Sequence, residues 1–206
     1  MTPAIEVAHL APNQVGEAGQ VLGRAFQDDP FWMWLLPDES RRSRVVPWAM
    51  GVAARFGHRY GDVHATAGKV EGAAIWFAPG KFPLSLVRQM LSGWILAPLK
   101  LGPADFGRFM SGVNHLEHLH KRDAPPRHWY LWLLGVDPPR QGQGVGGGLI
   151  QPVLARADAE GALCYLETVT TRNVPFYQRH GFEVVVEGDQ PRDGPHFWTM
   201  KREPKG

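Results

Sequence analysis

The sequence of 206 residues predicts an α+β fold in which helices flank one mixed sheet. Three observations lead to this prediction. Segments with apolar residues at helical spacing alternate with short apolar runs typical of buried strands. A glycine-rich turn joins the longest strand candidate to a helix. No internal repeat or long linker divides the chain, so we expect a single domain over residues 1–206.

The first half is predicted to contain a strand, two helices and a pair of strands. Apolar residues recur at helical spacing over Val15–Phe26, with Asn13 as the expected N-cap, and again over Ser40–Arg59. Between the two helices, Phe31–Leu36 is predicted to form a compact aromatic turn. The strands are expected over Ala4–Leu10, Asp62–Thr66 and Lys69–Ala78.

The second half is predicted to begin with two helical segments, Pro83–Leu101 and Pro103–His120, inserted before the longest strand, His128–Val136. The glycine turn follows and opens a helix that continues to about Glu160. After that helix we expect a strand over Ala162–Val169, a short helix over Asn173–Arg179, and closing strands over Phe182–Glu187 and His196–Lys201.

Composition narrows the class of protein. Lys and Arg number 22 against 20 Asp and Glu, an excess too small to predict a nucleic-acid partner. No apolar run approaches the roughly 18 residues of a membrane-spanning helix. Met1–Leu10 lacks a basic region followed by an apolar one, so we expect no secretory leader. Cys164 is the single cysteine, which excludes an internal disulfide. We therefore expect a cytoplasmic protein without a membrane partner.

The glycine turn, Gln141-Gly-Gln-Gly144-Val-Gly146, is typical of an anion-binding site. Glycine lets the backbone approach a ligand, and the free N–H groups of a first helical turn attract negative charge. No lysine follows the glycines as a phosphate-binding Walker loop requires. The spacing also matches a dinucleotide-binding fingerprint, with Glu167 near the expected acidic position. However, only one further strand–helix step follows, which argues against a two-halved nucleotide fold.

Two motifs together resemble the GNAT N-acetyltransferase superfamily. The first is Gln141-Gly-Gln-Gly144-Val-Gly146, after a strand that ends in Leu134-Gly-Val136. The second is Asn173-Val-Pro-Phe176-Tyr177, which continues to Gly181-Phe182. Leu166–Phe182 further resembles puromycin N-acetyltransferase and its bacterial relatives. The strong resemblance covers about Trp129 to Lys201, and the first half of the chain is only weakly matched.

This resemblance implies a mostly antiparallel sheet of about seven strands, splayed between the fourth and fifth, with a helical insertion before the fourth. It also implies acetyl-CoA as co-substrate and no metal. Gly135 is expected to mark a bulge that opens the fourth strand, although it can also simply relieve packing. The residues expected to bind acetyl-CoA are Leu134, Gly135, Val136, Gln141, Gly142, Gln143, Gly144, Val145, Gly146, Asn173, Phe176 and Tyr177.

Tyr177 stands at the family's position for a general acid that protonates the leaving thiolate. The alternative is a half-buried tyrosine whose hydroxyl is satisfied by the protein. Asn173 is expected to bond the pantetheine arm or a water, or to cap its short helix. Glu167 is the expected general base, and its alternative role is an ion pair with an arginine. His128 and Asp29 are weaker candidates for the base.

The remaining reactive side chains suggest no further chemistry. His115, His118 and His120 lack the spacing and partners of a metal site, so we expect them on a solvated helix face. Cys164 lies among apolar residues and is expected to be an inert core thiol.

The acceptor is predicted to be a small-molecule amine. The helical insertion is larger than a minimal acetyltransferase needs, which favours a shaped pocket walled by Phe31–Leu36, Pro83–His120 and Gly188–Gly194. Asp28, Asp29 and Asp38 are available to attract an amine, or to serve turns and caps. Two alternatives stay open: a non-catalytic acyl-CoA-binding or sensor module, and an acetyltransferase for protein N-termini or lysines. A monomer and a homodimer are both compatible with the sequence.

Overall fold

The computed structural model describes residues 5–205, in which seven strands form one sheet in the order β1-β2-β3-β4-β5-β7-β6. Neighbouring strands are antiparallel except for β4 and β5, which are parallel. This confirms the predicted α+β class and the mostly antiparallel sheet. Ala4, where the first strand was expected to begin, lies outside the described residues. The strands are β1 (Val7–His9), β2 (Asp62–Thr66), β3 (Gly72–Phe77), β4 (Trp129–Val136), β5 (Cys164–Thr168), β6 (Glu183–Asp189) and β7 (His196–Arg202).

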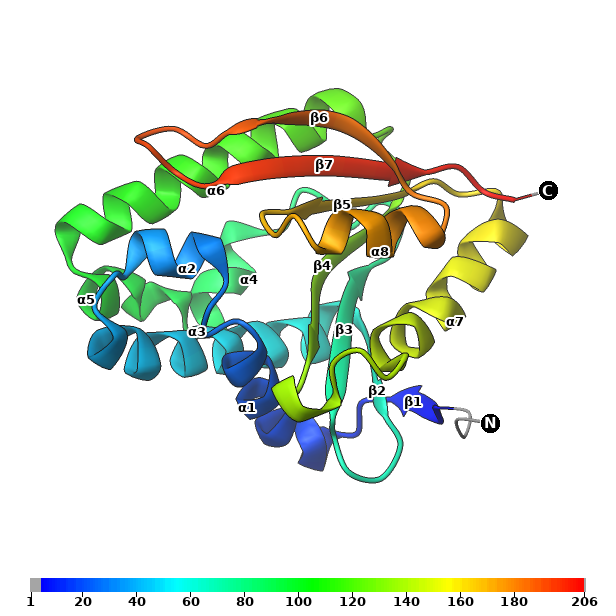
Figure 1. The fold of residues 1–206 in the computed structure, drawn as a ribbon, viewed down its shortest axis with the longest axis horizontal. Helices are drawn as coiled ribbons and strands as arrows, with labels where there is room; N and C mark the ends of the chain where they lie inside the picture. The colour runs from blue at the N-terminus through cyan, green and yellow to red at the C-terminus, as the bar shows by residue number, and fades with distance from the viewer. Residues whose placement is uncertain (1–4, 206) are drawn as a thin grey trace.

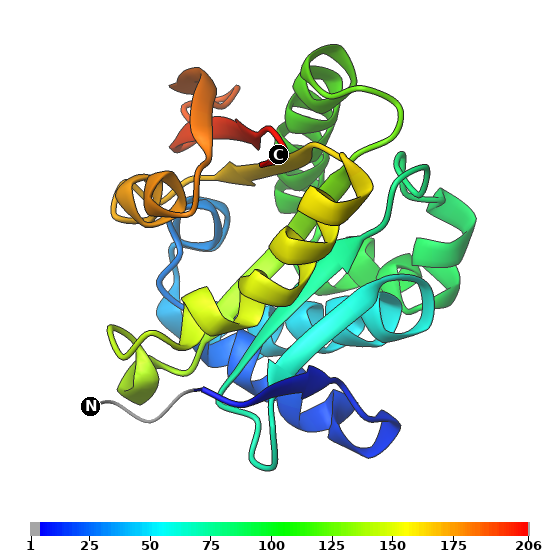
Figure 2. The same cartoon turned by 90° about the vertical axis from the view of Figure 1, so that its right-hand side faces the viewer.

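Helices cover both faces of the sheet (Figures 1 and 2). α1 and α3 pack on one face of the central strands, while α7 packs on the other face against β2, β3 and β4. The α-helices are α1 (Val15–Ala25), α2 (Pro30–Leu35), α3 (Glu39–Tyr60), α4 (Leu86–Leu91), α5 (Ala97–Leu101), α6 (Pro103–Asp123), α7 (Val145–Glu160) and α8 (Asn173–Arg179). Short 3-10 helices are η1 (Pro12–Gln14), η2 (Trp94–Leu96) and η3 (Pro138–Arg140).

Two hydrophobic cores result from the alternation of side chains along the strands. In β5, Tyr165 packs into the core beneath α1 and α3, whereas Cys164 and Leu166 pack into the core beneath α7. In β3, Ile75 likewise packs into the core beneath α1 and α3, and Trp76 packs into the core beneath α7. Because both faces are covered, the central strands are apolar throughout, as the sequence indicated.

Small residues bring α1 and α3 into close contact. A Cβ on Gly19 would lie 2.9 Å from the Cα of Gly51, and a Cβ on Gly23 would lie 2.9 Å from the Cα of Pro47. Any larger side chain would push the two helices apart. The glycines of α1 therefore fix the position of α3, which forms part of one wall of the cavity described below.

Two of the predicted local structures in the first half are wrong. Phe31–Leu36 is helical rather than a turn, because Pro30 occupies the first helical position of α2 and the carboxylate of Asp29 accepts a hydrogen bond from Phe31 N at 3.0 Å. Asn13 lies inside η1 and does not cap α1, whose N-cap residue is Gln14. The apolar spacing was read correctly, but the local hydrogen bonds decide the helix ends.

The predicted helix over Pro83–Leu101 is divided into α4, η2 and α5. Gly93 separates them with a φ of 121°, which side-chain-bearing residues rarely adopt. α6, in contrast, is longer than predicted and continues to Asp123. No helix within residues 5–205 combines the length and the apolar character needed to span a bilayer.

Candidate active site

The sheet opens between β4 and β5. The two strands pair only from Trp129 to Leu131 on β4, opposite Cys164 to Leu166 on β5. Beyond that point β4 stays with β3, while β5 stays with β7 as far as Thr168. The splay predicted between the fourth and fifth strands is therefore confirmed. It leaves one backbone edge of β4 free over Leu134–Val136, where the acyl arm was expected.

The irregularity in β4 lies at Trp132 and not at Gly135. Ile75 pairs with Leu133 and Trp76 with Leu131, so Trp132 is the extra residue on β4. As a result, Trp132 and Leu133 both face the core beneath α1 and α3. Gly135 stays in register with Ala73.

Gly135 has a packing role instead. A Cβ at this position would lie 2.7 Å from Leu22 Cδ2 and 3.1 Å from Ala25 Cβ. Glycine therefore lets α1 lie against β4. The bulge expected at Gly135 is wrong, and the packing alternative is correct.

The glycine turn presents backbone amides at the start of α7. Gly142 and Gly144 have φ angles of 74° and 83°, and Gly144 is the N-cap residue. A Cβ on either glycine would meet no atom within 4 Å, so they are needed for their conformation, and they face open space. The amides of the first helical turn are then available to an anionic group.

The two exposed glutamine side chains of the turn each bond back to a main-chain carbonyl of the loop. Gln141 Nε2 donates to Val136 O at 3.1 Å, and Gln143 Nε2 donates to Pro139 O at 2.9 Å. Val145 is buried in the core beneath α7 and anchors the helix. These bonds hold the turn in a shape that leaves its main-chain amides accessible.

α8 brings Asn173, Phe176 and Tyr177 to the opening in the sheet. Phe176 lies against Gly146, because a Cβ on that glycine would be 3.4 Å from Phe176 Cζ. Asn173 Nδ2 donates to Thr168 Oγ1 at 3.3 Å, which ties α8 to the end of β5. Asn173 is the first residue of α8 and not its N-cap, so the capping alternative is wrong.

Tyr177 is 6% exposed and lines the cavity at the opening. Among residues 5–205, no side chain forms a hydrogen bond with the Tyr177 hydroxyl. The hydroxyl therefore differs from that of a tyrosine whose hydrogen bonds are all made within the protein. Burial, and secondarily the charge of Asp29, raises the pKa of Tyr177 well above its ordinary value. The phenol is therefore protonated at neutral pH.

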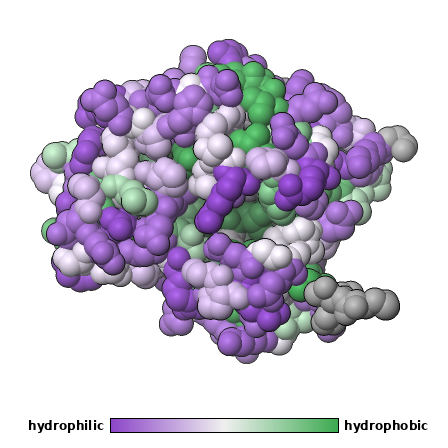
Figure 3. Space-filling view, viewed as in Figure 1, coloured by the Kyte–Doolittle hydropathy of each residue, from purple (hydrophilic) through white to green (hydrophobic). Residues whose placement is uncertain are grey.

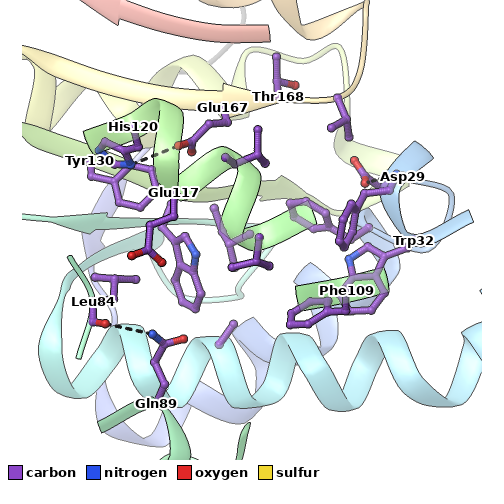
Figure 4. A pocket seen from close by; sticks show the side chains of 18 of the residues that line it. Asp29, Trp32, Leu84, Gln89, Phe109, Glu117, His120, Tyr130, Glu167 and Thr168 are labelled. Carbon is purple, nitrogen blue, oxygen red and sulfur yellow. Dashed lines mark hydrogen bonds and ion pairs between the residues drawn. The ribbon is translucent and has the colours of Figure 1, made fainter. Parts of the chain in front are cut away.

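Glu167 faces histidine and tyrosine rather than arginine (Figure 4). Its Oε1 lies 3.2 Å from His120 Nδ1. Tyr130 is beside it, and burial together with the Glu167 carboxylate raises the pKa of Tyr130. The alternative of an arginine ion pair is wrong. So is the solvated position expected for His120, which is 1% exposed although His118 on the same helix is exposed.

The three clustered histidines of α6 therefore point to different surroundings. His115 packs edge-on against Phe197, and His118 faces solvent. Within the described part of the chain, the one group with metal-compatible spacing comprises His9, Asp62 and His64, and it lies outside the cavity. Cys164 is fully buried, and burial raises the pKa of its thiol to about 12, as expected for an inert core thiol.

A cavity of about 330 Å³ lies on the other side of the opening. Figure 3 shows a hollow with a hydrophobic floor at the centre of this face, between polar rims. The expected walls are confirmed, since α2, the helical insertion and the 188–194 loop all contribute. The aromatic residues that line the cavity include Phe31, Trp32, Phe82, Trp94, Phe106, Phe109, Tyr130 and Trp132.

Four carboxylates had been considered for this side, and two reach the cavity. Asp29 and Glu167 line it. Asp38 caps α3 by accepting from Arg41 N at 2.7 Å, and Asp28 is largely exposed near Arg42. Burial raises the pKa of Asp29 to about 6, although Phe31 N and Thr170 Oγ1 bond to it.

Several cavity residues were not identified from the sequence. Glu117, His120 and Tyr130 gather around Glu167, and Phe109 and Trp132 form part of the apolar wall. No local motif marks them, because they come from α6 and β4 and meet only in the folded chain. The one available signal was the helical spacing of Glu117 and His120, three residues apart on one face of α6.

Comparison with known proteins gives a consistent result. Residues 109–182 match the model of the acetyltransferase (GNAT) family, a stretch that contains both motifs. The same fold is found in an acetyltransferase from Corynebacterium glutamicum that is described as related to histone acetyltransferase HPA2. The two structures have a TM-score of 0.72 and 21% sequence identity over 98% of each chain.

Two further solved structures share the fold at lower identity. A putative arylalkylamine N-acetyltransferase 7 from Aedes aegypti has a TM-score of 0.64 and 15% identity, over 96% of this chain and 86% of that one. An agmatine N-acetyltransferase in its apo form has a TM-score of 0.59 and 15% identity, over 97% and 99%.

Proposed function

We propose that this chain, which has the GNAT acetyltransferase fold and whose residues 109–182 match the model of that family, transfers the acetyl group of acetyl-CoA directly to a primary amine of a small molecule. One observation carries the proposal. An amide-lined turn on one side and an aromatic-lined cavity on the other meet at the opening between β4 and β5, where Tyr177 stands.

The residues of the cofactor side fit coenzyme A. The pyrophosphate needs several N–H donors without a bulky side chain, and the main chain from Gln141 to Gly146 offers them. The amide-containing pantetheine arm needs a free strand edge, and Leu134, Gly135 and Val136 supply one. Asn173 and Phe176 flank the path between the two.

Tyr177 is the proposed general acid. The amine lone pair attacks the thioester carbon, a C–N bond forms, and the C–S bond breaks with its electron pair going to sulfur. Tyr177 gives its proton to that sulfur, and a proton lost by the amine nitrogen restores the phenol. The raised pKa keeps the proton on Tyr177 until the thiolate leaves.

Glu167 is the proposed base that receives the other proton of the acceptor, which enters as an ammonium ion. It lies on the acceptor side of the opening, next to the aromatic wall of the cavity. Asp29 lies at the other end of the same cavity and holds the cap of α2 (Figure 4). Because the Asp29 carboxylate is already engaged in capping α2, Glu167 is the better candidate for the base.

The walls and the lining of the cavity favour a small acceptor over a protein chain. A protein terminus needs an open groove, whereas this cavity is walled by α2, α4 and α6. Its aromatic lining suits an amine with an apolar or aromatic body, attached to an ammonium group that the carboxylates attract. The putative arylalkylamine N-acetyltransferase and the agmatine N-acetyltransferase share the fold.

The test is thiol release from acetyl-CoA with panels of acceptors. We expect turnover with aromatic or aliphatic primary amines, and lower turnover with polyamines, amino sugars and peptides that have free N-termini. Turnover confined to peptides would overturn the small-molecule assignment. Acetyl-CoA binding by calorimetry without turnover on any acceptor would instead support a sensor.

A further inference from the structure

A line of three side chains, the half-buried Glu167 and two buried histidines, runs from the cavity into the protein. Glu167 Oε1 is 3.2 Å from His120 Nδ1, and His120 Nε2 is 2.7 Å from His128 Nε2. His128 Nδ1 in turn is 2.5 Å from the carbonyl oxygen of Pro125. His120 and His128 are 1% and 4% exposed. The line joins α6, β5 and the residue before β4, so no sequence motif records it.

The carbonyl oxygen of Pro125, which ends this line of hydrogen bonds, determines which histidine nitrogens carry protons. A carbonyl oxygen only accepts, so His128 Nδ1 must donate to Pro125. Burial, and secondarily the neighbouring His120, lowers the pKa of His128, which keeps that ring neutral. A neutral His128 with its proton on Nδ1 has a bare Nε2, which accepts. His120 must therefore donate from Nε2, and its Nδ1 faces the carboxylate of Glu167.

His120 is fixed in this orientation by its neighbours. Its ring stacks on Phe82 with centroids 3.7 Å apart and on Tyr165 with centroids 4.1 Å apart. Such rings favour a cationic imidazole over their faces. The other ionisable groups that face the pair are Tyr130 from β4 and Glu117 from α6, and Lys121 holds the Glu117 carboxylate at 2.5 Å.

From this geometry we infer that Glu167 and His120 form one proton-accepting unit, with His128 as the residue that positions it. The inference rests on the proposed function and names the base of that reaction more closely. The acceptor ammonium loses one proton to the Glu167 carboxylate. That proton passes to His120 Nδ1, which is thereby converted to imidazolium, and the carboxylate regains its charge.

The unit then carries no net charge while the neutral amine attacks. His128 stabilises the imidazolium because its Nε2 accepts a hydrogen bond from His120 Nε2–H, and the positive charge on His120 strengthens that bond. After the product leaves and water enters the cavity, Glu167 returns the proton to solvent. In this scheme His120 receives the proton by way of Glu167, which faces the acceptor, and His128 is the positioning residue.

The scheme predicts a distinctive pH dependence. Two groups that share one proton titrate as a unit. At low pH the unit already holds its proton and accepts no other, so turnover rises as the pH increases. In His120→Asn the amide still bonds to Glu167 but takes no proton. We expect kcat to fall about 10²-fold at its plateau, and the acidic limb of the profile to move to lower pH.

The matched control is His118→Asn, on the same helix and exposed. It should keep the turnover and the pH profile of the unmodified protein. A His120→Asn profile that coincides with that of the unmodified protein would overturn the inference. So would a lower plateau without any movement of the acidic limb, because a purely structural contact would produce that result.

A second measurement needs no variant and no turnover. Two-bond ¹⁵N correlation spectra of histidine-labelled protein report which ring nitrogens carry protons. We expect a neutral His128 protonated on Nδ1, and a His120 that carries a proton on Nε2. A His128 protonated on Nε2 would overturn the inference. If no amine is ever acetylated, the proposed function fails, and these spectra still decide whether the proton is shared.

Discussion

The two sides of β4 present different kinds of surface. The cofactor side, formed by the glycine turn, α7 and α8, offers backbone amides and a free strand edge. The acceptor side, formed by α2, α4, α6 and the other face of β4, offers side chains from segments far apart in the sequence. Backbone recognition requires particular residues at a fixed local spacing. A cavity walled by side chains does not, so many sequences can form one.

The largest expected effect concerns the residue where the two sides meet. Tyr177→Phe removes the proton donor without changing the packing of α8. We expect kcat to fall by about 10²–10⁴-fold, while the KM for acetyl-CoA changes little. Steady-state thiol release across a range of pH measures both. Equal turnover in the variant at every pH would remove Tyr177 from the role of acid.

Removing a carboxylate should change the stability at pH 8 in opposite directions on the two sides of β4. Burial raises the pKa of Asp29 from 3.8 to about 6, so the folded protein binds this proton more tightly than the unfolded chain. The contribution to stability is complete below pH 3.8 and is lost as the pH rises through about 6. Asp29→Asn keeps an N-cap side chain and escapes that loss. We expect it to be about 1–3 kcal/mol more stable than the unmodified protein at pH 8, and nearly equal at pH 4.

The matched variant on the cofactor side is Asp137→Asn. The hydrogen bonds from Arg24, whose Nε and Nη2 both lie 2.8 Å from the carboxylate, lower the pKa of Asp137. A lowered pKa contributes stability above the unfolded value, and that stability is lost as the pH falls. This variant should therefore be less stable at pH 8. Chemical denaturation at both pH values tests the pair, and shifts of the same sign would contradict the assignment.

A fourth variant tests whether the cofactor side depends on backbone conformation. Gly144→Ala places a side chain at a φ of 83°, which costs about 1–2 kcal/mol. We expect the KM for acetyl-CoA to rise about tenfold, because the amides of the first turn of α7 are displaced. Gly68→Ala is the control, since Gly68 has a φ of 71° and equally open space. It should lose similar stability and keep its KM.

The smallest expected effect is confined to the acceptor side. Val113→Phe adds a ring to the wall of the cavity. We expect the KM for a bulky aromatic amine to rise by several-fold, less than the tenfold that corresponds to about 1.4 kcal/mol. The KM for acetyl-CoA and for a short alkylamine should stay the same. Val87→Phe, on the exposed face of α4, is the control. A uniform change for all acceptors would contradict the assigned wall.

Most of the fold was predictable from the sequence, because buried strands and amphipathic helices carry periodic signals. All seven strands and both motifs are where the pattern predicts them. The errors fall where a local contact overrides periodicity. Asp29 caps the aromatic segment that was predicted as a turn, and the segment forms α2. Gly93 interrupts the helix predicted over Pro83–Leu101. Gly135 was misread because its neighbours on α1 are distant in sequence.

The cofactor side of the site was therefore determined by the sequence itself. A left-handed turn before a helix needs glycine at Gly142 and Gly144, and that requirement is visible in the residues. The tertiary structure alone decided the acceptor side. Glu167 was identified as a carboxylate without a known partner, and folding placed His120 and His128 behind it. Contacts between side chains on separate elements depend on how those elements pack, and no local spacing encodes that arrangement.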